Sequence, residues 1–231
     1  MSTSLLRKRV AKIGSLRNFR GPQNRRYYQS LLRRLSWPSY DNENGLVTVG
    51  ITSSLSGEGA STVAMQLAIT AAGFAGNRIL LVDYNIARPS ITNHFRLTNR
   101  PGMVEILKEG GRVADCLQPT SIANLSCLTA GIGSESAEFV YDSFGLPEMV
   151  ESLRADFDLV VFDMPPVGKA SDATRLAGLA DGILLVVEAE RVRWEVALKT
   201  KDLLLRANAD LLGVVFNKRK KYVPGWLYRT L

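Results

Sequence analysis

Short apolar runs rich in β-branched residues recur along the chain, and segments of helical composition separate them. Runs of this length and composition predict buried strands. Strands that alternate with helices predict an α/β fold, a mostly parallel sheet with helices on both faces. The predicted strands lie at 45–52, 78–85, 158–163, 182–189 and 211–217, with a weaker one at 125–131, and the predicted helices lie at 24–35, 61–77, 146–157 and 194–209.

Polar residues stand where several of these strands end. Asp83 and Asp163 close two apolar runs, Asn217 closes the last one, and a loop at 53–61 follows the first. In open parallel sheets, ligands bind beyond the carboxyl ends of the strands. The sequence therefore predicts that these residues converge at one edge of the sheet.

The loop "SSLSGEGAST" at 53–62 resembles a P-loop, which reads G-x-x-x-x-G-K-[ST] between a strand and a helix. Gly57 and Gly59 give the backbone the freedom that such a loop needs. A loop of this kind presents N–H groups and the positive end of a helix to phosphates. Ala60, however, stands where the pattern has lysine, while Ser61 and Thr62 keep the hydroxyl position.

Length and cysteine usage narrow the class of protein. A chain of 231 residues with 46% hydrophobic residues suits one well-buried domain. Cys116 and Cys127 form no CxxC pair, and with His94 as the one histidine the chain has too few soft ligands for zinc. We expect a reduced, cytoplasmic protein. The sequence has no apolar run long enough for a membrane span and no secretory signal pattern.

The net charge of +7 is unevenly distributed. Residues 1–40, a basic N-terminal segment, hold ten Lys and Arg residues and no acid, and residues 218–231 hold five. The stretch between them therefore carries a net charge of −8. Basic ends on an acidic body suit anionic lipid headgroups or an acidic partner surface. A solvated arm and an organelle transit peptide are the alternatives, and no recognition motif for nucleic acid accompanies the charge.

Three motifs stand in order along the body: "TSSLSGEGAST" (52–62), "ILLVDYNIARPSITNHF" (79–95) and "FDLVVFDMPPV" (157–167). Together they resemble the cytoplasmic ATPase domain of bacterial tyrosine autokinases of polysaccharide export, the BY-kinases, which are relatives of the cell-division and plasmid-partition ATPases. The resemblance covers residues 45–218. It implies a P-loop NTPase-like domain at 41–218, followed by a basic, tyrosine-containing tail at 219–231.

The resemblance also implies site residues. Asp83 and Asp163 would be the catalytic carboxylates of an active enzyme, Ser61 and Asp163 would hold Mg²⁺, and Asn217 would lie near the adenine. ATP or ADP would be bound by the loop, whose residues are Gly57, Glu58, Gly59, Ala60, Ser61 and Thr62. From the residues alone, Glu58 is expected to be a solvated loop charge, His94 to be structural, and Asn217 to be either a site residue or a cap of its strand.

Several residues depart from the family pattern. Ala60 replaces the phosphate-binding lysine, Asn85 the second carboxylate of D-x-D, Ser56 a proline and Met164 a threonine. The family's E-x-x-R-x-x-R pattern, used in ring assembly, lacks its glutamate in "NRRYYQSLLRRL" (24–35), so a ring-shaped homo-oligomer is not expected. The tyrosine-rich tail of the family is reduced to Tyr222 and Tyr228.

These departures favour a pseudokinase that binds ATP, ADP and Mg²⁺ weakly or not at all. It would act at the inner-membrane face as a regulatory or scaffolding partner in exopolysaccharide synthesis or export, docked to an inner-membrane polysaccharide co-polymerase. The alternative is an active ATP-dependent protein-tyrosine autokinase of the same pathway. A partition-type ATPase ranks last, because that class expects a second lysine early in the loop and 53–59 contains none.

Overall fold

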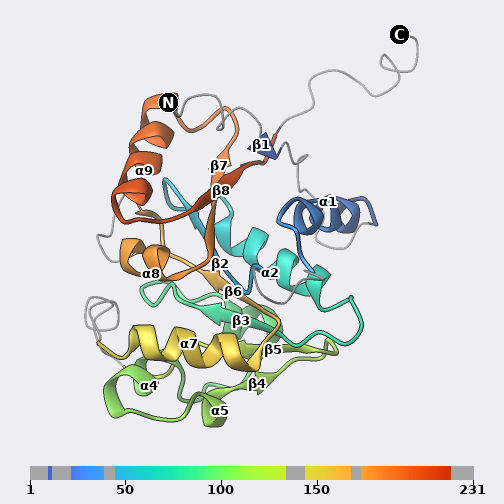
Figure 1. Cartoon of the computed structure of the whole chain (residues 1–231), viewed down its shortest axis with the longest axis vertical. Helices are drawn as coiled ribbons and strands as arrows, with labels where there is room; N and C mark the ends of the chain where they lie inside the picture. Colours follow the sequence, from blue (N-terminus) through green and yellow to red (C-terminus); the bar gives the residue numbers. More distant parts are fainter. Residues whose placement is uncertain (1–9, 12–21, 39–44, 134–143, 168–172, 220–231) are drawn as a thin grey trace.

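The computed structural model describes residues 10–11, 22–38, 45–133, 144–167 and 173–219. Within them the chain forms one eight-stranded sheet in the order β1-β8-β7-β2-β6-β3-β5-β4 (Figure 1). Neighbouring strands are parallel except β4 and β5, which pair antiparallel. The strands are β1 (Val10–Ala11), β2 (Thr48–Ser53), β3 (Ile79–Asp83), β4 (Gln118–Pro119), β5 (Leu125–Leu128), β6 (Leu159–Asp163), β7 (Gly182–Glu188) and β8 (Leu211–Asn217).

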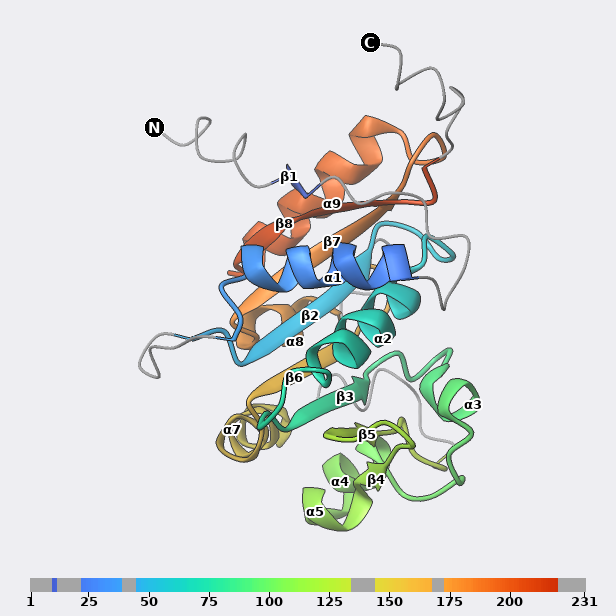
Figure 2. The ribbon, with the colours of Figure 1, turned by 90° about the vertical axis from the view of Figure 1, so that its right-hand side faces the viewer.

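Helices cover both faces of the sheet, as Figures 1 and 2 show. α1 and α2 lie on one face, and α7, α8 and α9 lie on the other. This arrangement confirms the α/β fold that the alternation of strands and helices predicts. The helices are α1 (Pro22–Arg34), α2 (Ala60–Ala71), α3 (Ile91–Phe95), α4 (Met103–Glu109), α5 (Val113–Cys116), α7 (Leu146–Asp156), α8 (Ala173–Leu179) and α9 (Trp194–Arg206).

The strand residues alternate between two hydrophobic cores. In β3, Ile79 and Leu81 pack with α1 and α2, whereas Leu80 and Val82 pack with the helices of the opposite face. Because successive side chains of a strand point to opposite faces, a strand buried on both sides reads as a continuous apolar run. This explains why the central strands were readable from the sequence.

The helix α1 anchors part of the basic N-terminal segment on the domain. Tyr28, Leu31 and Leu32 are buried in the core that α1 shares with α2. The opposite side of the helix is exposed and carries four arginines, namely Arg25, Arg26, Arg33 and Arg34. α1 therefore belongs to the packed body while it presents positive charge to solvent.

The structure differs from the expected elements in several places. The helix predicted at 61–77 ends at Ala71, and the weak strand predicted at 125–131 ends at Leu128. The short helices α4 and α5 and the antiparallel β4 were not predicted, since elements of two to seven residues carry little periodicity. No helix in the described ranges is long and apolar enough to cross a membrane.

Candidate nucleotide-binding site

The loop between β2 and α2 has the backbone shape of a phosphate cradle. Gly57 and Gly59 adopt φ angles of 87° and 96°, a region that residues with a Cβ rarely enter. A Cβ on Gly59 would lie 2.2 Å from Nδ2 of Asn217, so only glycine fits this close approach. No side chain caps the N-terminus of α2. The first N–H groups of this helix are therefore available to an anion.

Glu58 is buried, which corrects the expectation of a solvated charge. Its carboxylate accepts hydrogen bonds from the backbone N–H groups of Ser54 at 2.7 Å and Leu55 at 2.9 Å, and a longer one from Glu188 at 3.4 Å. Burial raises the pKa of Glu58, while the backbone hydrogen bonds oppose that shift. Glu58 thus holds the first residues of the loop in place through its buried carboxylate.

Ala60 is the first residue of α2 and is buried, so no side-chain cation originates at this position. Three cations from other loops contact the loop tip instead. Arg88 donates to Oγ of Ser56 at 3.1 Å, and Lys218 donates through Nζ to the carbonyl oxygen of Gly57 at 2.5 Å. Arg191 lies 3.4 Å from the carbonyl oxygen of Ser56. All three contacts are with carbonyl and hydroxyl oxygens of the loop.

The two strand-end carboxylates meet as predicted. Asp83 and Asp163 are register partners on the neighbouring strands β3 and β6, and both are fully buried. Oδ2 of Asp83 accepts hydrogen bonds from the N–H groups of Ser90 at 2.8 Å and Ile91 at 3.0 Å. Oδ2 of Asp163 accepts a long hydrogen bond from the hydroxyl of Ser90 at 3.4 Å, and the hydroxyl of Ser61 acts to lower the pKa of Asp163. The Oδ1 atoms of both carboxylates have no partner in the described part of the chain.

Burial controls the charge of this pair. Loss of water raises the pKa of Asp83 to about 6. Loss of water, with the nearby charge of Asp83 as the second cause, raises the pKa of Asp163 to about 8. Two buried carboxylates without a cation cannot both ionise cheaply. Burial and mutual repulsion therefore both favour the protonated form of Asp163.

The same atoms fit a magnesium ion. Mg²⁺ prefers hard oxygen ligands and keeps several of its waters. Ser61 and Asp163 supply a hydroxyl and a carboxylate oxygen near each other, and the unpartnered Oδ1 atoms could accept from metal-bound water. When bound, the ion would neutralise phosphate charge. Ser61 and Asp163 are the residues that would hold it.

Asn217 joins the end of β8 to the loop. Its Nδ2 donates to the carbonyl oxygen of Glu58 at 2.8 Å, and its Oδ1 accepts from the N–H of Lys218 at 2.9 Å. Asn217 is therefore more than a strand cap, because it positions the loop. Its place near an adenine stays a prediction.

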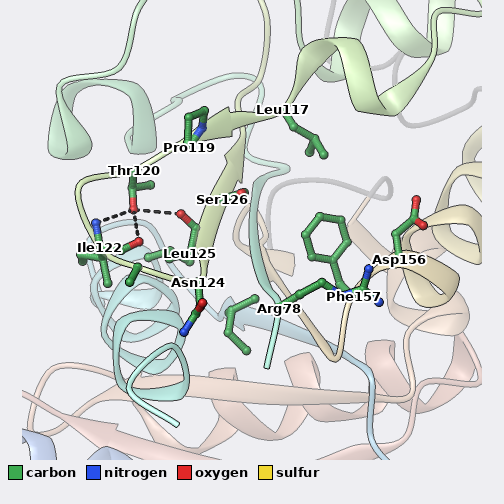
Figure 3. A pocket seen from close by; sticks show the side chains of 12 residues that line it. Arg78, Leu117, Pro119, Thr120, Ile122, Asn124, Leu125, Ser126, Asp156 and Phe157 are labelled. Atoms are coloured by element: carbon green, nitrogen blue, oxygen red, sulfur yellow. Dashed lines mark hydrogen bonds between the residues drawn. The ribbon is translucent and has the colours of Figure 1, made fainter. Parts of the chain in front are cut away.

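A surface cavity of about 510 Å³ lies away from this site, at the amino ends of β3 and β5 (Figure 3). Arg78, Asn124 and Phe157 are among its lining residues, and Thr120 hydrogen-bonds within its wall. None of the predicted site residues lines it. The strand-end motifs rather than this cavity therefore define the candidate site.

The comparisons with known proteins agree with this geometry. The ParA family model, described as NUBPL iron-transfer P-loop NTPase, matches residues 46–225. The chain is 30% identical over 197 residues to the tyrosine-protein kinase YwqD of Bacillus subtilis, which covers 85% of this chain and 82% of YwqD. The chain belongs to the ParA-like P-loop NTPases and, among them, to the BY-kinases. Its resemblance to that family is thereby confirmed.

Two solved structures that the chain resembles have the same fold. The chimerical protein CapA2B2 superposes with a TM-score of 0.82 at 25% identity, over 94% of this chain and 97% of the chimera. The kinase domain of VpsO superposes with a TM-score of 0.72 at 26% identity, over 84% of this chain and 100% of that domain. The BY-kinase fold therefore extends over most of the chain.

Reasoning from sequence missed four residues of the site, Ser90, Glu188, Arg191 and Lys218. Each contacts a predicted site residue or the loop across a long stretch of sequence, as Ser90 does with Asp163 and Lys218 with Gly57. A signal existed for Lys218, since it directly follows Asn217 at the end of a strand. Glu188 carried a similar signal, since it is the polar residue that closes the apolar run of β7, whereas Arg191 stands in the connection to α9 without such a mark.

Proposed function

We propose that this chain is a BY-kinase-like protein of exopolysaccharide synthesis or export that has lost phosphoryl transfer and acts as a regulatory or scaffolding partner. The observation that carries the proposal is the start of α2, where Ala60 leaves the cradle without its own cation. The nearby cations Arg88, Arg191 and Lys218 contact oxygen atoms of Ser56 and Gly57 in the loop instead.

The absence of a lysine at residue 60 is expected to reduce the rate of phosphoryl transfer more than it changes the shape of the loop. Phosphoryl transfer depends mostly on positioning and on cations that stabilise the charge of the transition state. A lysine would supply charge-assisted hydrogen bonds of roughly 1.5–3 kcal/mol each. Asn85 adds a second loss, because an amide cannot offer the negative charge of the family's second carboxylate. ATP, ADP and Mg²⁺ are therefore expected to bind weakly or not at all.

The proposed partner is an inner-membrane polysaccharide co-polymerase, met at the cytoplasmic face of the membrane. The structural similarity to CapA2B2, a chimerical protein, supports a kinase-like domain that works beside a second protein. The exposed arginines of α1 support attachment to an acidic or anionic surface. We expect no nucleic-acid partner and no ring of copies assembled through α1, which lacks the family's glutamate.

The active autokinase is the second candidate. Ser61, Asp83 and Asp163 are kept and lie together, and the similar proteins YwqD and VpsO bear kinase names. Turnover of ATP distinguishes the pseudokinase from the active autokinase. Calorimetric titration with Mg-ATP, followed by measurement of phosphate on tyrosine, is expected to give weak or no binding and no phosphorylation. Phosphotyrosine formed by the unmodified chain would favour the autokinase.

Membrane attachment gives a further prediction. Residues 1–20 hold six basic residues and no acid, and α1 adds four exposed arginines. Each basic residue near an anionic surface contributes about 1 kcal/mol at best. We expect the full chain to bind vesicles rich in anionic lipid, to release them as salt increases, and to lose at least about 10-fold in affinity when residues 1–20 are deleted.

Vesicle co-sedimentation measures this affinity. A matched variant keeps the length of the chain but replaces the six basic residues of 1–20 by glutamine, which removes charge alone. It should behave like the deletion. Equal binding by all three proteins would mean that the basic residues of 1–20 do not contribute to membrane binding.

A further inference from the structure

The site offers a replacement for the missing lysine, an inference that rests on the proposed function and deepens it. We infer that Lys218 is the phosphate-binding cation of this loop in place of residue 60, and that Glu188 holds Lys218 aside when no anion is bound. The ligand class is a phosphate oxyanion, either free as pyrophosphate or as the terminal phosphate of a nucleotide.

Lys218 is held against the loop by its neighbours. Its backbone N–H donates to Oδ1 of Asn217, and Nδ2 of the same asparagine donates to the carbonyl oxygen of Glu58. The end of β8 is thereby tied to the loop that opens α2. From this anchor the Lys218 side chain reaches Gly57, where Nζ donates to the carbonyl oxygen at 2.5 Å. The cation that directly follows β8 thus contacts the residue before Glu58.

Glu188 forms an ion pair with Lys218 and another with Arg191. Oε2 of Glu188 lies 3.1 Å from Nζ of Lys218 and 2.8 Å from Nη1 of Arg191. The side chain of Lys218 is 44% exposed, so this ion pair is wet and contributes little to stability. Because an ion pair with one half-exposed partner contributes little free energy, a phosphate oxygen can compete with Glu188 for the ammonium group. An anion in the cradle can therefore draw Lys218 away from Glu188.

Lys218 suits this role better than the two arginines at the loop. Arg191 and Arg88 both contact Ser56, whereas Lys218 contacts Gly57, one residue nearer to the start of α2. Lysine carries a compact charge on a flexible four-carbon stem, so Nζ can turn from a carbonyl to a phosphate without a backbone change. This is the task that the lysine of an ordinary P-loop performs from the helix.

Three variants of the full chain test the inference, titrated in a calorimeter with pyrophosphate and separately with Mg-ADP. Lys218→Met should weaken binding of both ligands by about 10-fold, the effect of one lost charge-assisted bond. Glu188→Gln should tighten binding by about 3-fold or more, because the cations lose their competing carboxylate. Lys199→Met removes an exposed lysine of α9 and should bind like the unmodified chain. Thermal unfolding checks that each variant is folded.

Comparing pyrophosphate with Mg-ADP distinguishes a site for free phosphate from a site for a nucleotide. A Lys218 effect of equal size on pyrophosphate and Mg-ADP supports a contact with phosphate alone. The inference is overturned if Lys218→Met binds both ligands as tightly as the unmodified chain, or if the unmodified chain binds neither. Both results leave the pseudokinase proposal intact. Conversely, if the unmodified chain phosphorylates tyrosine and Lys218→Met binds both ligands about 10-fold more weakly, the pseudokinase proposal is overturned and the role of Lys218 is supported.

Discussion

Ala60→Lys is expected to tighten Mg-ATP binding about 10- to 100-fold, as one or two charge-assisted bonds would. The cradle is already formed, since Gly57 and Gly59 hold their left-handed conformations and no side chain caps α2. The new lysine would begin at the first residue of the helix, where the P-loop pattern places it. Turnover should recover only in part, because Asn85 remains.

Calorimetric titration of both proteins with Mg-ATP measures the gain. Ala60→Met is the matched control, because it adds a long side chain without the charge and should not improve binding. If Ala60→Lys and Ala60→Met bind Mg-ATP equally, the absent lysine is not what limits this site.

Asp163→Asn is expected to stabilise the protein without ligands at alkaline pH. Burial raises the pKa of Asp163 from its ordinary value of 3.8 to about 8, so the folded state binds this proton more tightly than the unfolded state does. The stability contributed by the protonated group is complete below the unfolded pKa and is lost as pH rises through the folded pKa. Asparagine stays neutral throughout and avoids that loss.

The expected pattern is a gap in the free energy of unfolding that widens with pH. Relative to the unmodified chain, Asp163→Asn should gain roughly 1–3 kcal/mol near pH 9 and little near pH 4. Urea denaturation in the presence of a chelator measures it, because bound Mg²⁺ would stabilise the ionised carboxylate. Asp156→Asn, at an exposed position of α7, serves as the control and should show no such gap. A constant difference across this pH range would show that Asp163 is not held protonated by its surroundings.

The sequence predicted the fold and the position of the site for the same physical reason. Strands buried on both faces read as apolar runs, and the chain becomes polar where each run leaves the sheet. The strand-end pattern therefore predicts that Asp83 and Asp163, far apart along the chain, lie together, and they are register partners. The glycines of the loop were equally readable, because positive φ and close approach demand them.

The hydrogen bonds and ion pairs around the loop could not be predicted in this way. Glu58 looks like any charge in a glycine-rich loop, and its burial depends on the backbone N–H groups of Ser54 and Leu55 that the folded loop turns toward it. The pairing of Glu188 with Lys218 depends on β7 and β8 being neighbours and on where each strand ends. Such contacts follow from the topology of the sheet, which local patterns do not encode.

One measurement tests the loss of phosphoryl transfer most directly. The unmodified full chain, purified after exposure to a tyrosine phosphatase, is incubated with Mg-ATP labelled at the γ-phosphate, and its peptides are examined for label on Tyr222 and Tyr228. We predict no incorporation above that of Asp163→Asn, which lacks the strand-end carboxylate. Label on either tyrosine that depends on Asp163 would contradict the pseudokinase proposal and identify the chain as an active autokinase.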